Sequence, residues 1–183
     1  MSLVEVLIVV ALLGIFAGVV VTRWDSGFHD QLTGAAQVVV SDIGYARHLA
    51  ITFGSRYAIN FDLTNHRYQL QHTGDDPTLD NLPPSPYRQP DDPPDRQTTD
   101  LARLPIASAT IELAAVHKQT PTPVDVTDLE FGPAGETARS EATVIWLAAG
   151  QGADRRYLAI EVDPVTGLAA IGGFRSALPM NGP

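Results

Sequence analysis

The apolar and polar positions divide the chain into three parts, of which the first is almost purely apolar. Leu3 to Thr22 contains a single ionisable residue, Glu5. A helix rises about 1.5 Å per residue, so twenty residues span roughly 30 Å, the thickness of a bilayer's hydrocarbon core. The basic region and small-residue cleavage site of a secretory signal are not seen. Residues 1–24 therefore predict a transmembrane or polymerising helix, with a buried helix of a soluble protein as the alternative.

Residues 25–54 carry a different, amphipathic pattern. Apolar residues recur there at steps of three and four positions, which is the spacing of one helix face. They are Leu32, Ala35, Ala36, Val39, Ile43, Ala46, Ala50 and Phe53, with Asp42 and Arg47 among the polar positions. Gly54 is placed as a C-cap, so the helix is expected to end at Phe53 or Gly54. The pattern predicts a continuation of the first helix that packs one face on a domain.

Residues 55–183 predict a β-rich globular domain. Alternation over 56–62 and 68–72, around a polar turn, predicts a β-hairpin. Further strands are predicted at Ala109–Val116, Asp128–Phe131, Ala142–Ala148, Tyr157–Val162 and Leu168–Ile171. Proline and glycine mark turns at Gly132–Gly135 and Asp163–Gly167. We expect an antiparallel sheet or pair of sheets, covered on one side by the amphipathic helix.

One segment of this domain, residues 73–105, is acidic and rich in proline. Between residues 73 and 100 there are seven aspartates and two arginines. Proline removes backbone donors and the aspartates repel one another, so the pattern excludes a central strand and predicts a solvated, extended loop. Calcium binding by these carboxylates is the alternative, although their spacing does not match an EF-hand.

Charge and composition exclude some functions. The 183 residues suffice for one domain and an accessory segment, and the formal net charge is -9 with a pI near 4.8. Because affinity for phosphate backbones comes mainly from clustered Lys and Arg, a nucleic-acid-binding surface is not expected, and Lys118 is the single lysine. The chain contains no cysteine, so disulfides and thiolate metal sites are excluded.

The apolar segment resembles the start of mature type IV pilins and pseudopilins. The residues that carry the resemblance are Leu3–Ile15, with Glu5 at the family's fifth mature position if Met1 is the first mature residue. The remainder resembles the minor pseudopilin class called GspH/FimT-type, in Ala46–Ile51, Phe131–Gly135 and Asp163–Ile171. The resemblance implies an α+β, pilin-like fold, in which a long N-terminal helix, transmembrane and then amphipathic, packs on antiparallel sheets.

The resemblance also implies how the chain is processed and placed. In that family a prepilin peptidase removes a basic leader and methylates the new N-terminus, which makes Met1 a possible N-methylation site. This sequence shows no leader and has Met1 where the family usually has phenylalanine. The implied partners are other pilin or pseudopilin subunits, an inner-membrane assembly platform, the peptidase and the lipid bilayer. The chain would be a single-pass inner-membrane protein with its β-rich domain in the periplasm.

Glu5 needs a partner on physical grounds alone. A carboxylate in an apolar segment costs on the order of 2.5–3.5 kcal/mol at the centre of a membrane, and less near an end. A free α-amino group is largely cationic at neutral pH, so the amine at Met1 of an adjacent subunit is a candidate partner. The alternative is a glutamate that reaches water at the membrane interface. Gly14 and Gly18 have the small-xxx-small spacing that lets helices approach closely.

No catalytic or metal-binding pattern is present, so neither an enzyme nor a cofactor is expected. The histidines, scattered without metal-ligand spacing, are His29, His48, His66, His72 and His117. Two of them, His66 and His72, could lie on neighbouring strands of the hairpin and form a zinc site, but exposed sheet histidines explain the pattern equally well. Glu136 and Glu141 around Arg139 are interpreted as solvated charge in an exposed turn.

Three functions are compatible with these observations. The leading hypothesis is a minor pseudopilin of a type II secretion system that assembles through its N-terminal helix to help move proteins across the outer membrane. The second is a FimT-like minor pilin for DNA uptake, which would need arginines such as Arg139, Arg155, Arg156 and Arg175 clustered on the domain. The third is a membrane-anchored β-domain that does not polymerise.

Overall fold

The computed structural model describes residues 3–21, 26–84, 89–105 and 110–178, without the side chains of residues 13–21 and 26. The helices are α1 (Leu3–Val21) and α2 (Ser26–Phe53), followed by the 3-10 turns η1 (Pro77–Leu79), η2 (Leu101–Arg103) and η3 (Gly152–Asp154). The strands are β1 (Tyr57–Asp62), β2 (Arg67–His72), β3 (Arg96–Asp100), β4 (Glu112–Lys118), β5 (Val124–Asp125), β6 (Asp128–Phe131), β7 (Thr143–Ala149), β8 (Arg156–Val162) and β9 (Ala169–Arg175).

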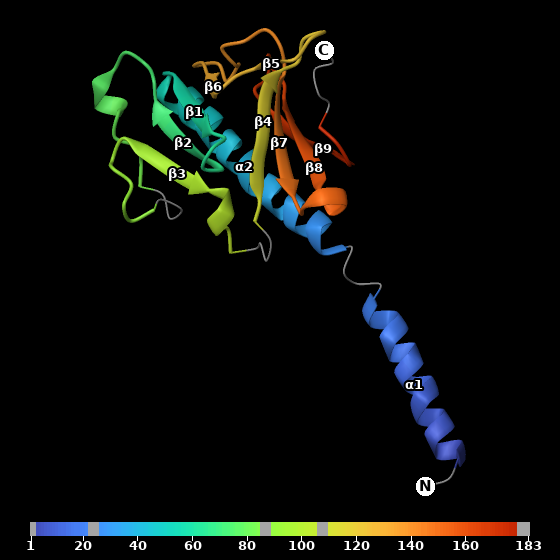
Figure 1. Cartoon of the computed structure of the whole chain (residues 1–183). Coiled ribbons are helices and arrows are strands. Elements are labelled where there is room, and N and C mark those ends of the chain that lie inside the picture. The colour runs from blue at the N-terminus through green and yellow to red at the C-terminus, as the bar shows by residue number, and fades with distance from the viewer. Residues whose placement is uncertain (1–2, 22–25, 85–88, 106–109, 179–183) are drawn as a thin grey trace.

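The strands form two antiparallel sheets that share one helix. The first has the order β3-β2-β1-β6 and the second β5-β4-β7-β8-β9. Helix α2 contacts β1 and β6 of the first sheet and β7, β8 and β9 of the second, while α1 extends away from both (Figure 1). The predicted α+β architecture, a helix packed on antiparallel sheets, is confirmed. The expected interface segment Arg23–Asp25 and the joint between the helices lie outside the described residues.

The buried face of α2 is the one that its periodicity predicts. The predicted positions from Leu32 to Ala50 are at most 1% exposed, and Leu49 joins them at 3%. Phe53 is the exception, since it is 42% exposed at the last residue of the helix, where the sheets no longer cover it. The apolar stripe of α2 thus supplies one wall of the core, against Ile59 and Leu129 of the first sheet and Ile145 and Ile160 of the second.

The end of α2 is a glycine C-cap, as predicted. Gly54 has a φ of 59°, in the left-handed region that glycine adopts without steric cost. The Ser55 N–H donates to the Ala50 carbonyl at 3.1 Å, which is the long bond of a Schellman motif. The helix therefore ends at Phe53, within the predicted limits.

The strand predictions are largely confirmed, with two omissions. The hairpin forms with Tyr57 opposite His72 and Asp62 opposite Arg67, and β6 has the predicted bounds. The strand predicted at Ala109–Val116 is β4, which begins three residues later within the described part and runs on to Lys118. Two edge strands, β3 and β5, were not predicted.

The prediction of a solvated loop at 73–105 is wrong in part. The segment folds back on the domain, because Leu82 and Leu101 are buried and β3 pairs with β2. Its aspartates accept backbone hydrogen bonds, as Asp92 does from Thr98 at 2.7 Å and Asp76 from Thr78 at 3.0 Å. Carboxylates thus stabilise tight turns in a proline-rich segment that has few regular hydrogen bonds. The exclusion of a central strand is confirmed, since β3 lies at a sheet edge.

The interpretation of His72 as an exposed sheet residue is also wrong. Its ring is fully buried, with Nδ1 2.8 Å from an Asp80 oxygen and Nε2 2.7 Å from Ser55 Oγ. His66 does not lie on a neighbouring strand either, because it occupies the hairpin turn with a φ of 51°. The imidazole therefore joins the end of β2 to the chain that leaves α2, which no local sequence pattern indicates.

Three segments distant in sequence meet at one end of the domain. The Arg47 side chain on α2 donates to the Thr166 carbonyl at 2.6 Å. The turns that end at Gly135 and Gly167 touch each other, because a Cβ on Gly167 would lie 2.1 Å from the Gly135 carbonyl oxygen. The Thr137 N–H also donates to the Pro164 carbonyl at 2.8 Å. This junction of Arg47, Gly135 and Gly167 joins α2 to both sheets.

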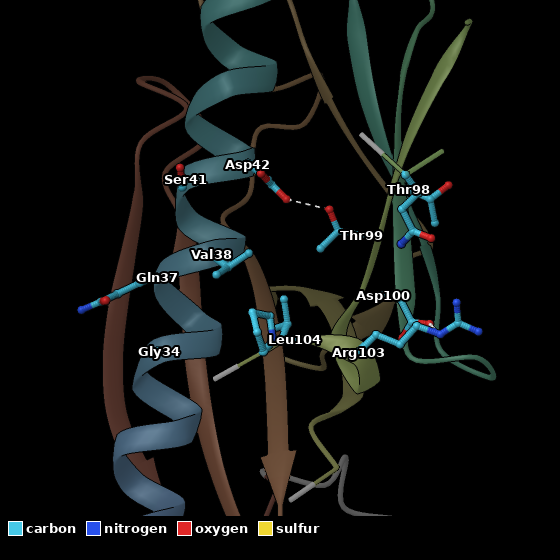
Figure 2. A pocket seen from close by; sticks show the side chains of 12 residues that line it. Gly34, Gln37, Val38, Ser41, Asp42, Thr98, Thr99, Asp100, Arg103 and Leu104 are labelled. Carbon is cyan, nitrogen blue, oxygen red and sulfur yellow. Dashed lines mark hydrogen bonds and ion pairs between the residues drawn. The ribbon is translucent and has the colours of Figure 1, made fainter. Parts of the chain in front are cut away.

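The hydrogen-bonded carboxylate of Asp42 also holds the first sheet on α2. Its Oδ2 accepts from the Tyr68 hydroxyl at 2.7 Å. It also accepts from the Thr99 hydroxyl at 2.9 Å, the bond drawn in Figure 2. Burial raises the pKa of Asp42, and these two hydrogen bonds lower it by a smaller amount. Asp42 is thus a partly buried acceptor for β2 and β3 rather than one of the solvent-facing polar positions of the helix.

The close approach at Gly167 predicts a stability effect. Gly152 has a similar φ of 57° but open space around its Cβ position, whereas Gly167 has a φ of 65° and no room. We expect Gly152→Ala to cost about 1–2 kcal/mol for the left-handed conformation alone. Gly167→Ala should cost about 1–3 kcal/mol more, because the methyl group overpacks the junction. Urea unfolding of both variants measures the difference, and equal midpoints would contradict the close contact.

The buried charge of Asp42 predicts a pH effect. A carboxyl whose pKa is higher in the folded than in the unfolded protein binds more protons when folded, so its contribution to stability falls as pH rises above 3.8. In Asp42→Asn this contribution is absent. The free energy of unfolding of the variant relative to wild type should therefore increase from pH 3.8 upward and become constant at higher pH. Urea unfolding of both proteins at several pH values measures this difference in free energy. A difference that is the same at every pH would contradict the raised pKa of Asp42.

Candidate assembly interface

The first feature of the candidate interface is the apolar start of α1, whose described side chains are not covered by the domain. Every side chain of residues 3–12 is exposed. Leu3 is 78% exposed and Leu7 62%, values far above those of the α2 core face. Successive residues of a helix point about 100° apart, so ten of them cover all directions. A helix that is apolar on all sides is normally buried in a protein core or a membrane.

One stripe of α1 has the geometry of a helix-packing surface. Leu3, Val6, Leu7 and Val10 follow the three- and four-residue steps of a single face and line a shallow groove of about 440 Å³. Such a groove receives the side chains of a facing helix in ridge-and-groove packing. The exposed part of α1 therefore has a surface suited to another helix.

Glu5 is the one acidic residue of this surface. It lies in the first turn of α1, and its side chain is exposed. The unpaired N–H groups at the start of a helix favour a negative charge there, so the position is compatible with a stable carboxylate. The structure thus places Glu5 beside the apolar stripe, near the N-terminal end of the helix.

Other predicted residues of this region are only partly described. Gly14 and Gly18 both lie within α1, four residues apart and hence on one side of the helix. Met1, the predicted partner for Glu5 and possible methylation site, lies outside the described residues. In the part of the chain that the structure describes, no helix is both long and apolar enough to span a membrane.

The arginines that DNA capture would need already have partners within the domain. Arg155 pairs with Glu112 at 2.6 Å and lies over the Tyr157 ring at 5.4 Å. Arg139 pairs with Asp128 at 2.7 Å, which corrects its interpretation as solvated charge between Glu136 and Glu141. Arg156 and Arg175 also have partners within the domain. Arg156 donates to the Ala153 carbonyl, and Arg175 lies over the Trp146 ring at 5.8 Å.

The acidic residues do not form a metal site in the described part of the chain. The turn after Gly54 borders a hollow of about 610 Å³, lined by Asp75, Asp76, Glu130 and Glu136. Asp75 is almost fully exposed and forms an ion pair with Arg56 at 3.6 Å. Among residues 3–21, 26–84, 89–105 and 110–178, no three histidine or carboxylate side chains are placed to hold a metal ion.

Proteins similar to this chain are found by comparison of structures and not by comparison of sequences. No protein-family model matches it, and no curated protein sequence matches it. The crystal structure of the type IV minor pilin FimU of Pseudomonas aeruginosa matches 79% of the chain and 90% of FimU, with a TM-score of 0.50 and 13% identity. The minor pseudopilin EpsH from the Type 2 Secretion System of Vibrio cholerae matches over 78% of the chain and 96% of EpsH, with a TM-score of 0.52 and 14% identity.

These likenesses extend over most of the chain, and they agree with the order of elements. A helix precedes two antiparallel sheets, and the segments that carry the resemblance in sequence, around Arg47, Gly135 and Gly167, meet in space. At such low identity the comparison establishes the fold and no residue's role. The chain therefore has the type IV pilin-like fold that it shares with the minor pilin FimU and the minor pseudopilin EpsH.

Proposed function

We propose that this chain is a minor pseudopilin subunit of a type II secretion system, anchored in the inner membrane and assembled into a filament through α1. The observation that carries the proposal is the exposed, all-round apolar surface of α1, with Glu5 in its first turn, on a chain with the pilin-like fold. Its work is mechanical, and no enzymatic step is part of it. The fold it shares with a pilin and a pseudopilin supports this view.

The apolar surface of α1 requires a cover. Burial of apolar area contributes about 25 cal/mol per Å², so leaving the large side chains of residues 3–12 in water is costly. A bilayer supplies the cover before assembly, and neighbouring α1 helices supply it afterwards. In an apolar environment helices associate by close packing, for which the Leu3–Val10 stripe and the Gly14–Gly18 spacing are suited.

Glu5 gives the assembly its register. Once α1 is surrounded by other helices, the carboxylate loses its contact with water and needs a cation. The amine of a neighbouring subunit at Met1 is the proposed partner, since it is charged at neutral pH and lies at the same end of the helix. The pairing would fix the axial offset between adjacent helices, which a purely apolar surface cannot do.

Each of the three segments of the chain has a role in the proposed filament. Residues 1–24 form the membrane and polymerisation segment, 25–54 its amphipathic continuation, and 55–183 the periplasmic domain. Helix α2 is buried against both sheets and so holds the domain at the end of the polymerising segment. The choice of secretion over DNA uptake is supported by the likeness to EpsH, and by arginines that are already paired within the domain.

Removal of the Glu5 carboxylate tests the assembly. Loss of one member of a buried ion pair typically costs about 3–5 kcal/mol, because the other charge is left unpaired. We expect Glu5→Ala to reduce filament incorporation roughly a hundredfold or more, since each 1.4 kcal/mol is about tenfold. Glu5→Gln should behave in the same way, because the charge and not the shape is required. Cross-linking between subunits in the producing cell measures the incorporation.

The control for this experiment is Val9→Ala, an apolar truncation on the same helix that leaves the charge in place. Membrane fractionation must show that all variants are inserted equally. If Glu5→Ala assembles as well as Val9→Ala, the chain is a simple membrane anchor and the pseudopilin proposal fails.

Processing supplies a second prediction. The proposal expects a methylated N-terminal residue, because the enzyme that exposes a pilin N-terminus also methylates it. Mass spectrometry of the N-terminal peptide of protein from the native membrane measures this at Met1. An unmodified or formylated initiator methionine in the assembled protein would contradict it.

A further inference from the structure

A cleft between α2 and the first sheet has no role in the proposed assembly. It has a volume of about 520 Å³, within the range of about 300–1,000 Å³ that is usual for ligand pockets. Val38 and Asp42 of α2 point toward Thr99 and Leu104 (Figure 2), and Gln37, Ser41 and Arg103 also border the cleft. The cleft thus combines apolar walls with a few polar groups, and Asp42 lies at its inner side.

Among the described residues, the charges that line the cleft leave one carboxylate without an ion-pair partner. Three charged residues line it, namely Asp42, Asp100 and Arg103. Arg103 Nε lies 3.2 Å from the Asp100 carboxylate, so these two neutralise each other. Asp42 forms no ion pair with any described residue of the chain, so the net charge of the lining is negative.

The hydrogen bonds of Asp42 also leave one oxygen atom available. The Tyr68 and Thr99 hydroxyls both donate to Oδ2. Oδ1 accepts no hydrogen bond from the described residues. A carboxylate has about four lone-pair positions and can accept from two donors of a guanidinium or ammonium group. Because burial raises the pKa of Asp42, a cation beside it would offset part of the desolvation that causes the rise.

We propose that this cleft binds a lysine or arginine side chain presented by a partner polypeptide, with the cation at Oδ1 of Asp42. The aliphatic stem of the basic side chain would contact Val38 and Leu104, in the way such stems usually cover apolar surface. The cleft is larger than one side chain requires, and two further polar residues, Gln37 and Ser41, border it. Neighbouring residues of the partner's chain therefore have groups with which to form hydrogen bonds.

The test uses the full chain in detergent micelles and a capped tripeptide of leucine, arginine and alanine. The comparison peptide carries citrulline, a neutral analogue of the same shape, in place of arginine. We expect saturable shifts of the amide resonances of Ser41 and Thr99, and at least tenfold tighter binding of the arginine peptide. Asp42→Asn keeps the acceptor for both hydroxyls but removes the charge, so the preference for arginine should disappear.

A second pair of variants tests the cleft without changing Asp42. Ser41→Trp fills the cleft from the helix and should abolish binding of both peptides. His48→Trp places the same side chain at an exposed position of α2 outside the cleft and should leave binding unchanged. Glu5→Ala should also leave it unchanged, so failure of the assembly proposal and of this one are distinguishable.

Three results would overturn the inference. Equal affinity for the arginine and citrulline peptides, in the wild-type chain, would show that the charge of Asp42 is not recognised. The absence of saturable shifts up to about 10 mM peptide would show that the cleft is not a binding site of useful affinity. If N-acetylarginine amide binds as tightly as the tripeptide, the single side chain suffices and the partner need not be a polypeptide.

Discussion

Burial of one face of α2 is the constraint on which the rest of the domain depends. The four- and five-stranded sheets are separate in strand pairing, and both pack on this helix. The small residues of the buried face, such as Ala35, Ala36 and Ala46, let the strands come close to the helix axis. The junction at Gly135 and Gly167 closes one end of the same arrangement, because Arg47 of α2 reaches the turn of the second sheet.

The two helices differ in whether the domain buries their apolar side chains, and their composition explains the difference. Helix α2 has an apolar face on one side and polar residues on the other, so packing against the sheets is enough to bury its apolar face. In α1 residues 3–12 are apolar on every side except at Glu5, and the side chains of these residues are all exposed. One helix therefore completes the fold, and the other presents the apolar surface that the proposed membrane anchoring and assembly would cover. This division is the physical basis for assigning assembly to α1 and mechanical connection to α2.

Periodicity predicts most of the fold, and long-range polar contacts account for what it misses. The buried stripe of α2, its glycine cap and the first hairpin follow from local spacing. Strand β3 does not, because its partner β2 lies about thirty residues earlier and a proline-rich segment hides the signal. Asp42 was likewise assigned to the polar side, since nothing near it in sequence shows that Tyr68 and Thr99 will donate to it. Glu5 and the apolar run were identifiable because their signal is local.

Asp42 takes part both in the packing of the first sheet on α2 and in the lining of the cleft between them. The carboxylate accepts hydrogen bonds from Tyr68 and Thr99. It also borders the cleft, which Thr99 lines as well (Figure 2). A buried carboxylate that served only to hold β2 and β3 could be replaced by a neutral acceptor, which would avoid the desolvation that raises its pKa. A cation beside the carboxylate would offset part of that desolvation. The Asp42 carboxylate therefore favours a basic side chain of a partner in the proposed cleft site. This proposal does not depend on how α1 assembles.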